Sequence, residues 1–144
     1  MNDPNLQDAF MTALNRAYQM EDLNMLSDFW QGSLRVLYQI YQHQDTENNP
    51  AALSAAIHVS RSRITSALES LKRKGYVQTQ VSPIDGRRVI VTLTQEGAAY
   101  IEAKQQSARK YLGRLLEGLG DKNITEFTRL INISVDIMEG REKR

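Results

Sequence analysis

The chain has 144 residues, of which 18 are basic and 17 acidic, so its formal net charge is only +1. It contains no cysteine, which excludes disulfides and thiolate zinc sites, and because it has just two histidines we expect no metal or other cofactor. No run of about 18 apolar residues and no basic-then-apolar leader occurs, so we expect a cytoplasmic protein.

The first predicted helix lies near the N-terminus. Its apolar residues recur at spacings of three and four and form one stripe: Leu6, Ala9, Phe10, Ala13, Leu14, Ala17 and Tyr18. Such a stripe needs a covering surface.

Two helices are predicted next. Residues 33–43 carry a broad apolar stripe, which is typical of a packed helix. A turn-rich break follows, after which Asn49 can cap, and Pro50 can begin, a short helix that runs to His58. We expect left-handed geometry at His58, because histidine is enriched there over most non-glycine residues.

The following helix begins after Ser60, which can cap its first turn, and ends at Gly75, where left-handed geometry costs little. Ile64, Leu68 and Leu71 share its apolar face. The opposite face is short, polar and rich in hydrogen-bond donors.

A hairpin with one buried face is predicted after this helix. Residues 77–81 and 89–93 alternate apolar and polar side chains on either side of a turn-forming run. Its tip carries Asp85, Arg87 and Arg88, and the negative potential of a DNA minor groove favours inserted arginine.

A long helix is predicted from about Gln95 until Gly120 interrupts it. A second apolar stripe follows the interruption: Ile124, Phe127, Leu130, Ile131, Val135 and Met138. The two terminal stripes could pack on one another, but we favour an isologous dimer.

Together these elements predict a mostly α chain with a small β-hairpin. We expect a winged helix-turn-helix domain in residues 33–94, between dimerisation helices in residues 1–32 and 95–144.

Charge is concentrated on the predicted helix-turn-helix and wing. Residues 51–90 hold seven basic and two acidic residues, whereas residues 1–50 hold two basic and seven acidic ones. Because DNA affinity depends on local charge, this distribution favours a DNA-contacting surface, although a charge run can also be an ordinary solvated face.

Two stretches resemble the MarR (multiple antibiotic resistance regulator) family of transcriptional regulators. Ser60-x-Ser-x-Ile-Thr65 through Leu71-x-x-x-Gly-Tyr-Val77 is similar to the family's recognition helix and its exit. Asp85-Gly-Arg87 through Leu93-Thr-x-x-Gly97 is similar to its wing and the entry into the next helix. The chain departs from the family pattern at His58, where glycine is commoner, and at Ser54, where alanine is commoner.

The resemblance implies a homodimer with intertwined terminal helices. It also implies a sequence-specific DNA-binding regulator, by default a repressor of a pseudo-palindromic operator, which a small phenolic or lipophilic effector releases. The effector would occupy a cleft between the winged domain and the dimer helices. Four aromatic residues lie on segments that could line it, although we favour their interpretation as ordinary core aromatics: Phe29, Trp30, Tyr38 and Tyr41.

The candidate DNA contacts fall into three groups. Base edges in the major groove are assigned to Ser62, Arg63, Thr65 and Ser66. Phosphates are assigned to Arg61, Lys72, Arg73 and Lys74. The wing would place Arg87 in the minor groove, with Asp85 orienting it and Arg88 beside it.

Two other classes of function compete with this one. An enzyme is not expected, because the sequence has no glycine-rich phosphate loop, Ser-His-Asp set or metal-ligand spacing. A winged module used for protein contacts, or for non-specific DNA binding without effector control, is the alternative function. The basic and hydroxyl side chains on the predicted reader face favour DNA.

Overall fold

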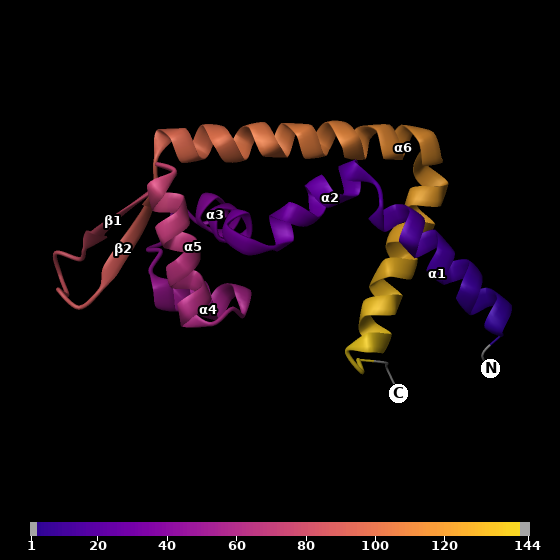
Figure 1. The fold of residues 1–144 in the computed structure, drawn as a ribbon, viewed down its shortest axis with the longest axis horizontal. Coiled ribbons are helices and arrows are strands. Elements are labelled where there is room, and N and C mark those ends of the chain that lie inside the picture. The colour runs from indigo at the N-terminus through magenta and orange to yellow at the C-terminus, as the bar shows by residue number, and fades with distance from the viewer. Residues whose placement is uncertain (1–2, 142–144) are drawn as a thin grey trace. The chain divides into compact units, whose positions relative to one another are not determined.

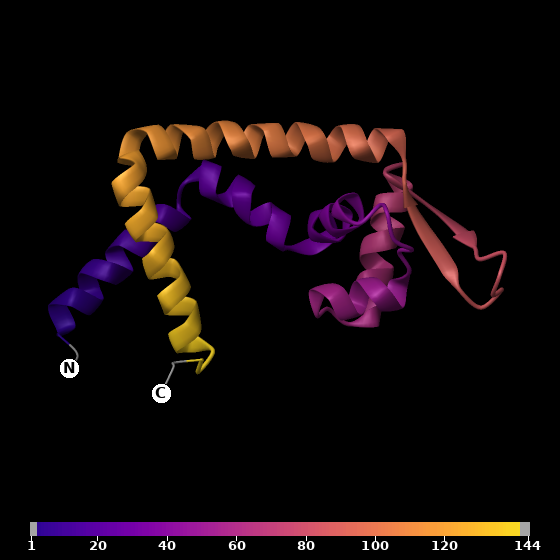
Figure 2. The ribbon, with the colours of Figure 1, turned by 180° about the vertical axis from the view of Figure 1, so that it is seen from behind.

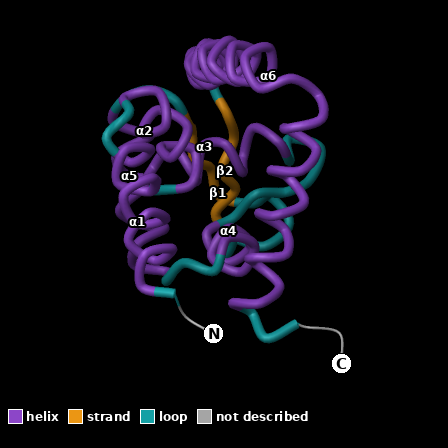
Figure 3. Tube along the Cα trace, turned by 90° about the vertical axis from the view of Figure 1, so that its right-hand side faces the viewer, coloured by secondary structure: helices purple, strands orange, loops and turns teal. Residues whose placement is uncertain are grey.

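The computed structural model describes residues 3–141. Its elements, shown in Figure 1, are α1 (Pro4–Tyr18), α2 (Glu21–Ser27), η1 (Asp28–Trp30), α3 (Gly32–Gln42), α4 (Pro50–Ile57), α5 (Arg61–Arg73), β1 (Val77–Val81), β2 (Val89–Leu93) and α6 (Gln95–Met138). The chain separates into two compact units between Gln106 and Ser107. Figure 3 shows that the strands of the described residues belong to one hairpin and that helices make up most of the rest.

The core of the first unit lies among α3, α4 and α5, which contact one another pairwise. Leu37 and Ile40 of α3, Leu53 of α4 and Ile64 and Leu71 of α5 are almost completely buried. Burying each such side chain stabilises the fold by about 1.5 to 3 kcal/mol. This apolar cluster fixes the angle between the helix-turn-helix pair.

The ends of α4 confirm the sequence predictions. The Asn49 Oδ1 accepts a hydrogen bond from the Ala52 backbone N at 2.8 Å, and Pro50 occupies the first turn. His58 has φ 55° and ψ 45°, which is the predicted left-handed geometry. The Ser54 hydroxyl donates to the carbonyl oxygen of Val59 at 2.5 Å, so the polar residue at this position provides a hydrogen bond to a backbone carbonyl of the turn that follows α4.

The two strands pair in antiparallel register, with Val77 opposite Leu93 and Val81 opposite Val89. The predicted buried face exists only at the base of the hairpin. Val77 and Val91 are buried there, whereas Val81 is 62% exposed and Val89 40% exposed. The distal half extends past the helices that cover the base, as Figures 1 and 2 show.

Thr94 and Gly97 join the hairpin to α6. The Thr94 Oγ1 donates to the Gly75 carbonyl oxygen at 2.6 Å and accepts from the Gly97 backbone N at 3.0 Å, so it caps α6. A side chain at Gly97 would collide with the carbonyl oxygen of Tyr76. This contact gives a physical reason for the Leu-Thr-x-x-Gly sequence.

Helix α6 begins at Gln95 and is interrupted at Gly120, which has φ 78° and ψ 162°. Both features agree with the sequence prediction. In the second unit Arg129 donates to Glu126 at 2.6 and 2.9 Å, and this hydrogen bonding lowers the pKa of the Glu126 carboxyl below its usual range.

Large apolar side chains on the terminal helices are uncovered in the single chain. In α1, Phe10 is 66% and Tyr18 76% exposed, and in α6 Phe127 is 51% and Ile137 51% exposed. None of the helices within residues 3–141 has the length and apolarity needed to cross a bilayer.

Candidate nucleic-acid interface

Helix α5 turns one face to the core and the other to solvent. Ile64, Leu68 and Leu71 are buried. The outward side chains are exposed, as the apolar spacing predicted, and include Ser62, Arg63, Ser66, Glu69 and Arg73. The geometry therefore presents hydroxyl and guanidinium groups along one surface.

Local hydrogen bonds order the first turn of α5. The Ser60 Oγ accepts from the Arg63 backbone N at 3.3 Å and lies 3.2 Å from the Ser62 Oγ. The Thr65 hydroxyl donates to the Arg61 carbonyl oxygen at 2.9 Å. Since that proton is engaged by the helix itself, Thr65 offers an acceptor and a methyl group to a partner, rather than a donor.

The cations on α5 differ in their contacts. No acidic group of the described residues forms an ion pair with Arg61, Arg63 or Arg73, all of which are exposed. The Lys72 Nζ instead donates to the Thr79 Oγ1 at 3.1 Å. Lys72 therefore ties the end of α5 to β1, a contact that the sequence analysis did not anticipate.

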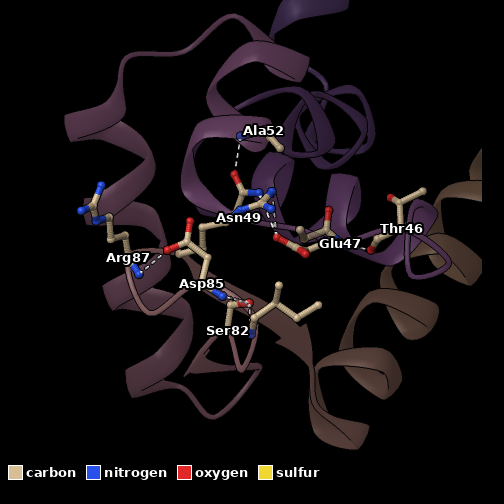
Figure 4. A network of polar contacts seen from close by, with 10 residues as sticks. Thr46, Glu47, Asn49, Ala52, Ser82, Asp85 and Arg87 are labelled. Carbon is tan, nitrogen blue, oxygen red and sulfur yellow. Dashed lines mark hydrogen bonds and ion pairs between the residues drawn. The ribbon is translucent and has the colours of Figure 1, made fainter.

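The turn at the tip of the hairpin is ordered by side-chain caps, several of which are visible in Figure 4. The buried Ser82 Oγ accepts from the backbone N of Ile84 and of Asp85, each at 3.3 Å. The Asp85 Oδ1 accepts from the Arg87 backbone N at 3.0 Å. Asp85 thus fixes the backbone of Arg87. Within the described residues, the Arg87 guanidinium forms no ion pair with Asp85 or with any other acidic group.

Arg88 has a partner that sequence reasoning missed. Its Nη2 lies 3.1 Å from the Oε1 of Glu47, in the loop between α3 and α4. The neighbouring Asn48 is buried, and its carbonyl oxygen accepts from the Val91 backbone N at 2.8 Å. No local sequence pattern pairs these two segments, because the contact arises only when the hairpin folds back on the loop.

The four aromatic candidates are distributed over different surroundings. Phe29 is buried and packs edge-on against Tyr38, with ring centroids 5.3 Å apart. The Tyr41 hydroxyl lies 3.4 Å from the Glu102 Oε1. Of the four, Trp30 lines an open hollow of about 750 Å³ beside α5, together with Arg63.

No group of three or more metal-ligating side chains lies close enough to hold an ion in the part of the chain that the structure describes. The chemistry that the site offers is hydrogen-bond donation and positive charge, from an exposed helix and an ordered turn. These groups suit phosphate oxygens and base edges.

Three packed helices followed by an antiparallel hairpin define a winged helix-turn-helix protein. Residues 31–88 match the model of the MarR family.

Similar proteins are transcriptional regulators. The chain is 24% identical over 101 residues to the HTH-type transcriptional repressor YetL of Bacillus subtilis, which covers 70% of this chain and 60% of YetL. It is 28% identical over 99 residues to the HTH-type transcriptional repressor IacR of Pseudomonas putida, which covers 69% of this chain and 58% of IacR. The matches thus span about three fifths of these relatives.

The fold is also similar to that of Streptococcus pneumoniae FabT, which was solved in complex with DNA. The TM-score is 0.66 at 16% identity, over 96% of this chain and 98% of FabT.

Proposed function

We propose that this chain is a cytoplasmic, sequence-specific DNA-binding transcriptional regulator, and a repressor by default. The observation that carries the proposal is the outward face of α5, where Arg61 and Arg63 are exposed beside serine hydroxyls and have no acidic partner within residues 3–141. The two curated relatives are repressors by name, which supports the same class of function.

The first turns of α5 would enter the major groove. Ser62, Arg63 and Ser66 would reach base edges there, and arginine pairs bidentately with guanine. Arg61, Arg73 and Lys74 would neutralise phosphates, whereas Lys72 contributes to the join between α5 and β1 in the free protein. Arg87 would enter the adjacent minor groove from a backbone that Asp85 holds.

The functional unit would be a homodimer. Exposed apolar side chains on α1 and on the last part of α6 would be covered by a second copy. Two copies of α5 would then contact half-sites about 10 base pairs apart, so the operator would be pseudo-palindromic.

Control by a small aromatic or lipophilic effector would follow if the effector bound the DNA-incompetent dimer more tightly than the competent one. The candidate effector site is the hollow beside α5, which Trp30 and Arg63 line. A ligand there would meet residues assigned to DNA.

Replacing Arg63 by alanine tests the proposed base contact. The variant dimer would lose one bidentate contact in each half-site, so binding to a selected operator should weaken by about 30-fold or more, at about 1 to 3 kcal/mol for each of the two contacts. Binding to an unrelated duplex should fall much less. Arg16→Ala, which removes the same charge from α1, is the matched control. Equal losses on both duplexes would contradict a reading role for Arg63.

A further inference from the structure

The wing is held to the rest of its unit mainly at the base. The Val91 backbone N donates to the Asn48 carbonyl oxygen at 2.8 Å, and Lys72 reaches Thr79 at 3.1 Å. Farther out, Val81 is 62% exposed and therefore contributes little apolar packing. The direction of the tip depends on whatever contacts the distal half makes.

One such contact links the distal half to the helix-turn-helix. Arg88 lies 3.1 Å from the Glu47 Oε1, and the same oxygen lies 3.4 Å from the Nδ2 of Asn49. Asn49 in turn caps α4 through the backbone N of Ala52. Figure 4 shows Glu47 and Asn49 together at this junction. A chain of polar contacts thus runs from the first turn of α4, through Asn49 and Glu47, to Arg88 in the wing.

We propose that Glu47 and Arg88 are a positioning pair that sets the direction of the wing tip, and that Arg88 is held for this purpose instead of contacting a phosphate. The inference rests on the proposed DNA-binding function and deepens it, because it assigns wing orientation to two residues outside α5. A carboxylate near a DNA-binding surface repels phosphate. A positioning role and a simple charge role therefore predict opposite effects when the charge of Glu47 is removed.

The effect of the pair is modest. The Arg88 side chain is 54% exposed and the Glu47 side chain 38% exposed, and solvent screens such pairs. An exposed ion pair typically shifts an equilibrium by a factor of about two to five. Wing position would be biased by that factor in each subunit.

The test compares Glu47→Gln with Asp45→Asn in the full chain. Asp45 is an exposed acid in the same loop, so its substitution removes the same charge without breaking the contact to the wing. Affinity is measured for the most enriched operator and for an unrelated duplex, and amide hydrogen exchange is measured at Ser82 and Arg88 in the free protein. Both amides bond within the tip, to the carbonyl oxygens of Arg88 and Asp85.

Glu47→Gln should weaken operator binding by about two- to fivefold for each half-site and speed exchange of the tip amides by about two- to fivefold. Asp45→Asn should leave exchange unchanged and bind both duplexes slightly more tightly. The double variant Glu47→Arg/Arg88→Glu, which swaps the two charges, should restore the slower amide hydrogen exchange of the wild type.

Two results would overturn the positioning role: tighter operator binding by Glu47→Gln that equals the gain in Asp45→Asn, or tip exchange identical to the wild type. If the wild type selects no operator, the proposed function fails, and the exchange measurement alone then decides whether the pair holds the wing.

Discussion

At the scale of single residues, short-range hydrogen bonds hold the backbone at two of the arginines assigned to DNA. Ser60 caps the turn that presents Arg63, and Asp85 fixes the backbone of Arg87. Such pre-ordering reduces the entropy lost when a side chain engages a partner.

Removing the Arg87 guanidinium should weaken operator binding by about tenfold, because the enhanced negative potential of a narrow minor groove stabilises an inserted arginine. Fluorescence anisotropy on Arg87→Ala measures this, with Lys110→Ala of α6 as an equal loss of charge outside the wing. An affinity and a salt dependence that both match the wild type would remove Arg87 from the interface.

Gly97→Ala should destabilise the fold by about 2 to 4 kcal/mol, since the added methyl group would collide with the Tyr76 carbonyl oxygen and lie 2.9 Å from Leu93. Urea unfolding measures the change. Gly113→Ala is the matched control in the same helix: its methyl group would meet no atom of residues 3–141 within 4 Å, and it should raise stability by up to about 1 kcal/mol. Equal stabilities would show that the α6 entry tolerates a side chain.

At the scale of elements, the proposed function gives α5 both a surface that reads bases and an end that binds phosphates. Arg73 and Lys74 are exposed near its C-terminus, where they also complement the helix dipole. The double variant Arg73→Ala/Lys74→Ala would remove two phosphate contacts from each subunit of the dimer, so it should lower the salt slope of DNA binding by about 3.6, because each phosphate contact contributes about 0.9. Titrations at several salt concentrations give the slope, and an unchanged slope would place these residues outside the interface.

Local sequence patterns predicted most of the elements and their ends. The caps at Asn49 and Ser60, the left-handed His58 and the interruption at Gly120 all depend on residues within a few positions of one another. Local chemistry determines such features, so a single sequence is enough to find them.

Features that depend on tertiary packing were not predictable in this way. Alternation along the hairpin predicted one buried face, but Val81 and Val89 are exposed because the covering helices end before them. The ion pair between Glu47 and Arg88 joins segments that are distant in sequence. Likewise, nothing in the spacing of Phe29, Trp30 and Tyr41 indicated that they lie in different surroundings.

At the scale of the whole molecule, the proposed dimer accounts for the exposed apolar faces of the terminal helices. Phe127→Glu should convert the dimer to a monomer, because it would place an unpaired charge in the apolar interface. Sedimentation equilibrium measures the mass. Ile84→Glu, at a wing-tip position that is 97% exposed, should leave the mass unchanged. A monomeric wild type, or a dimer that survives Phe127→Glu, would contradict this assignment.

Selection of bound sequences from a randomised duplex library with the purified chain, at moderate salt, tests the central claim most directly. The account predicts an enriched inverted repeat with half-sites about 10 base pairs apart, centre to centre, as two copies of α5 in a symmetric dimer require. The absence of any enriched motif, with weak binding that falls steeply as salt rises, would contradict it and leave a winged module that serves protein contacts or binds DNA non-specifically.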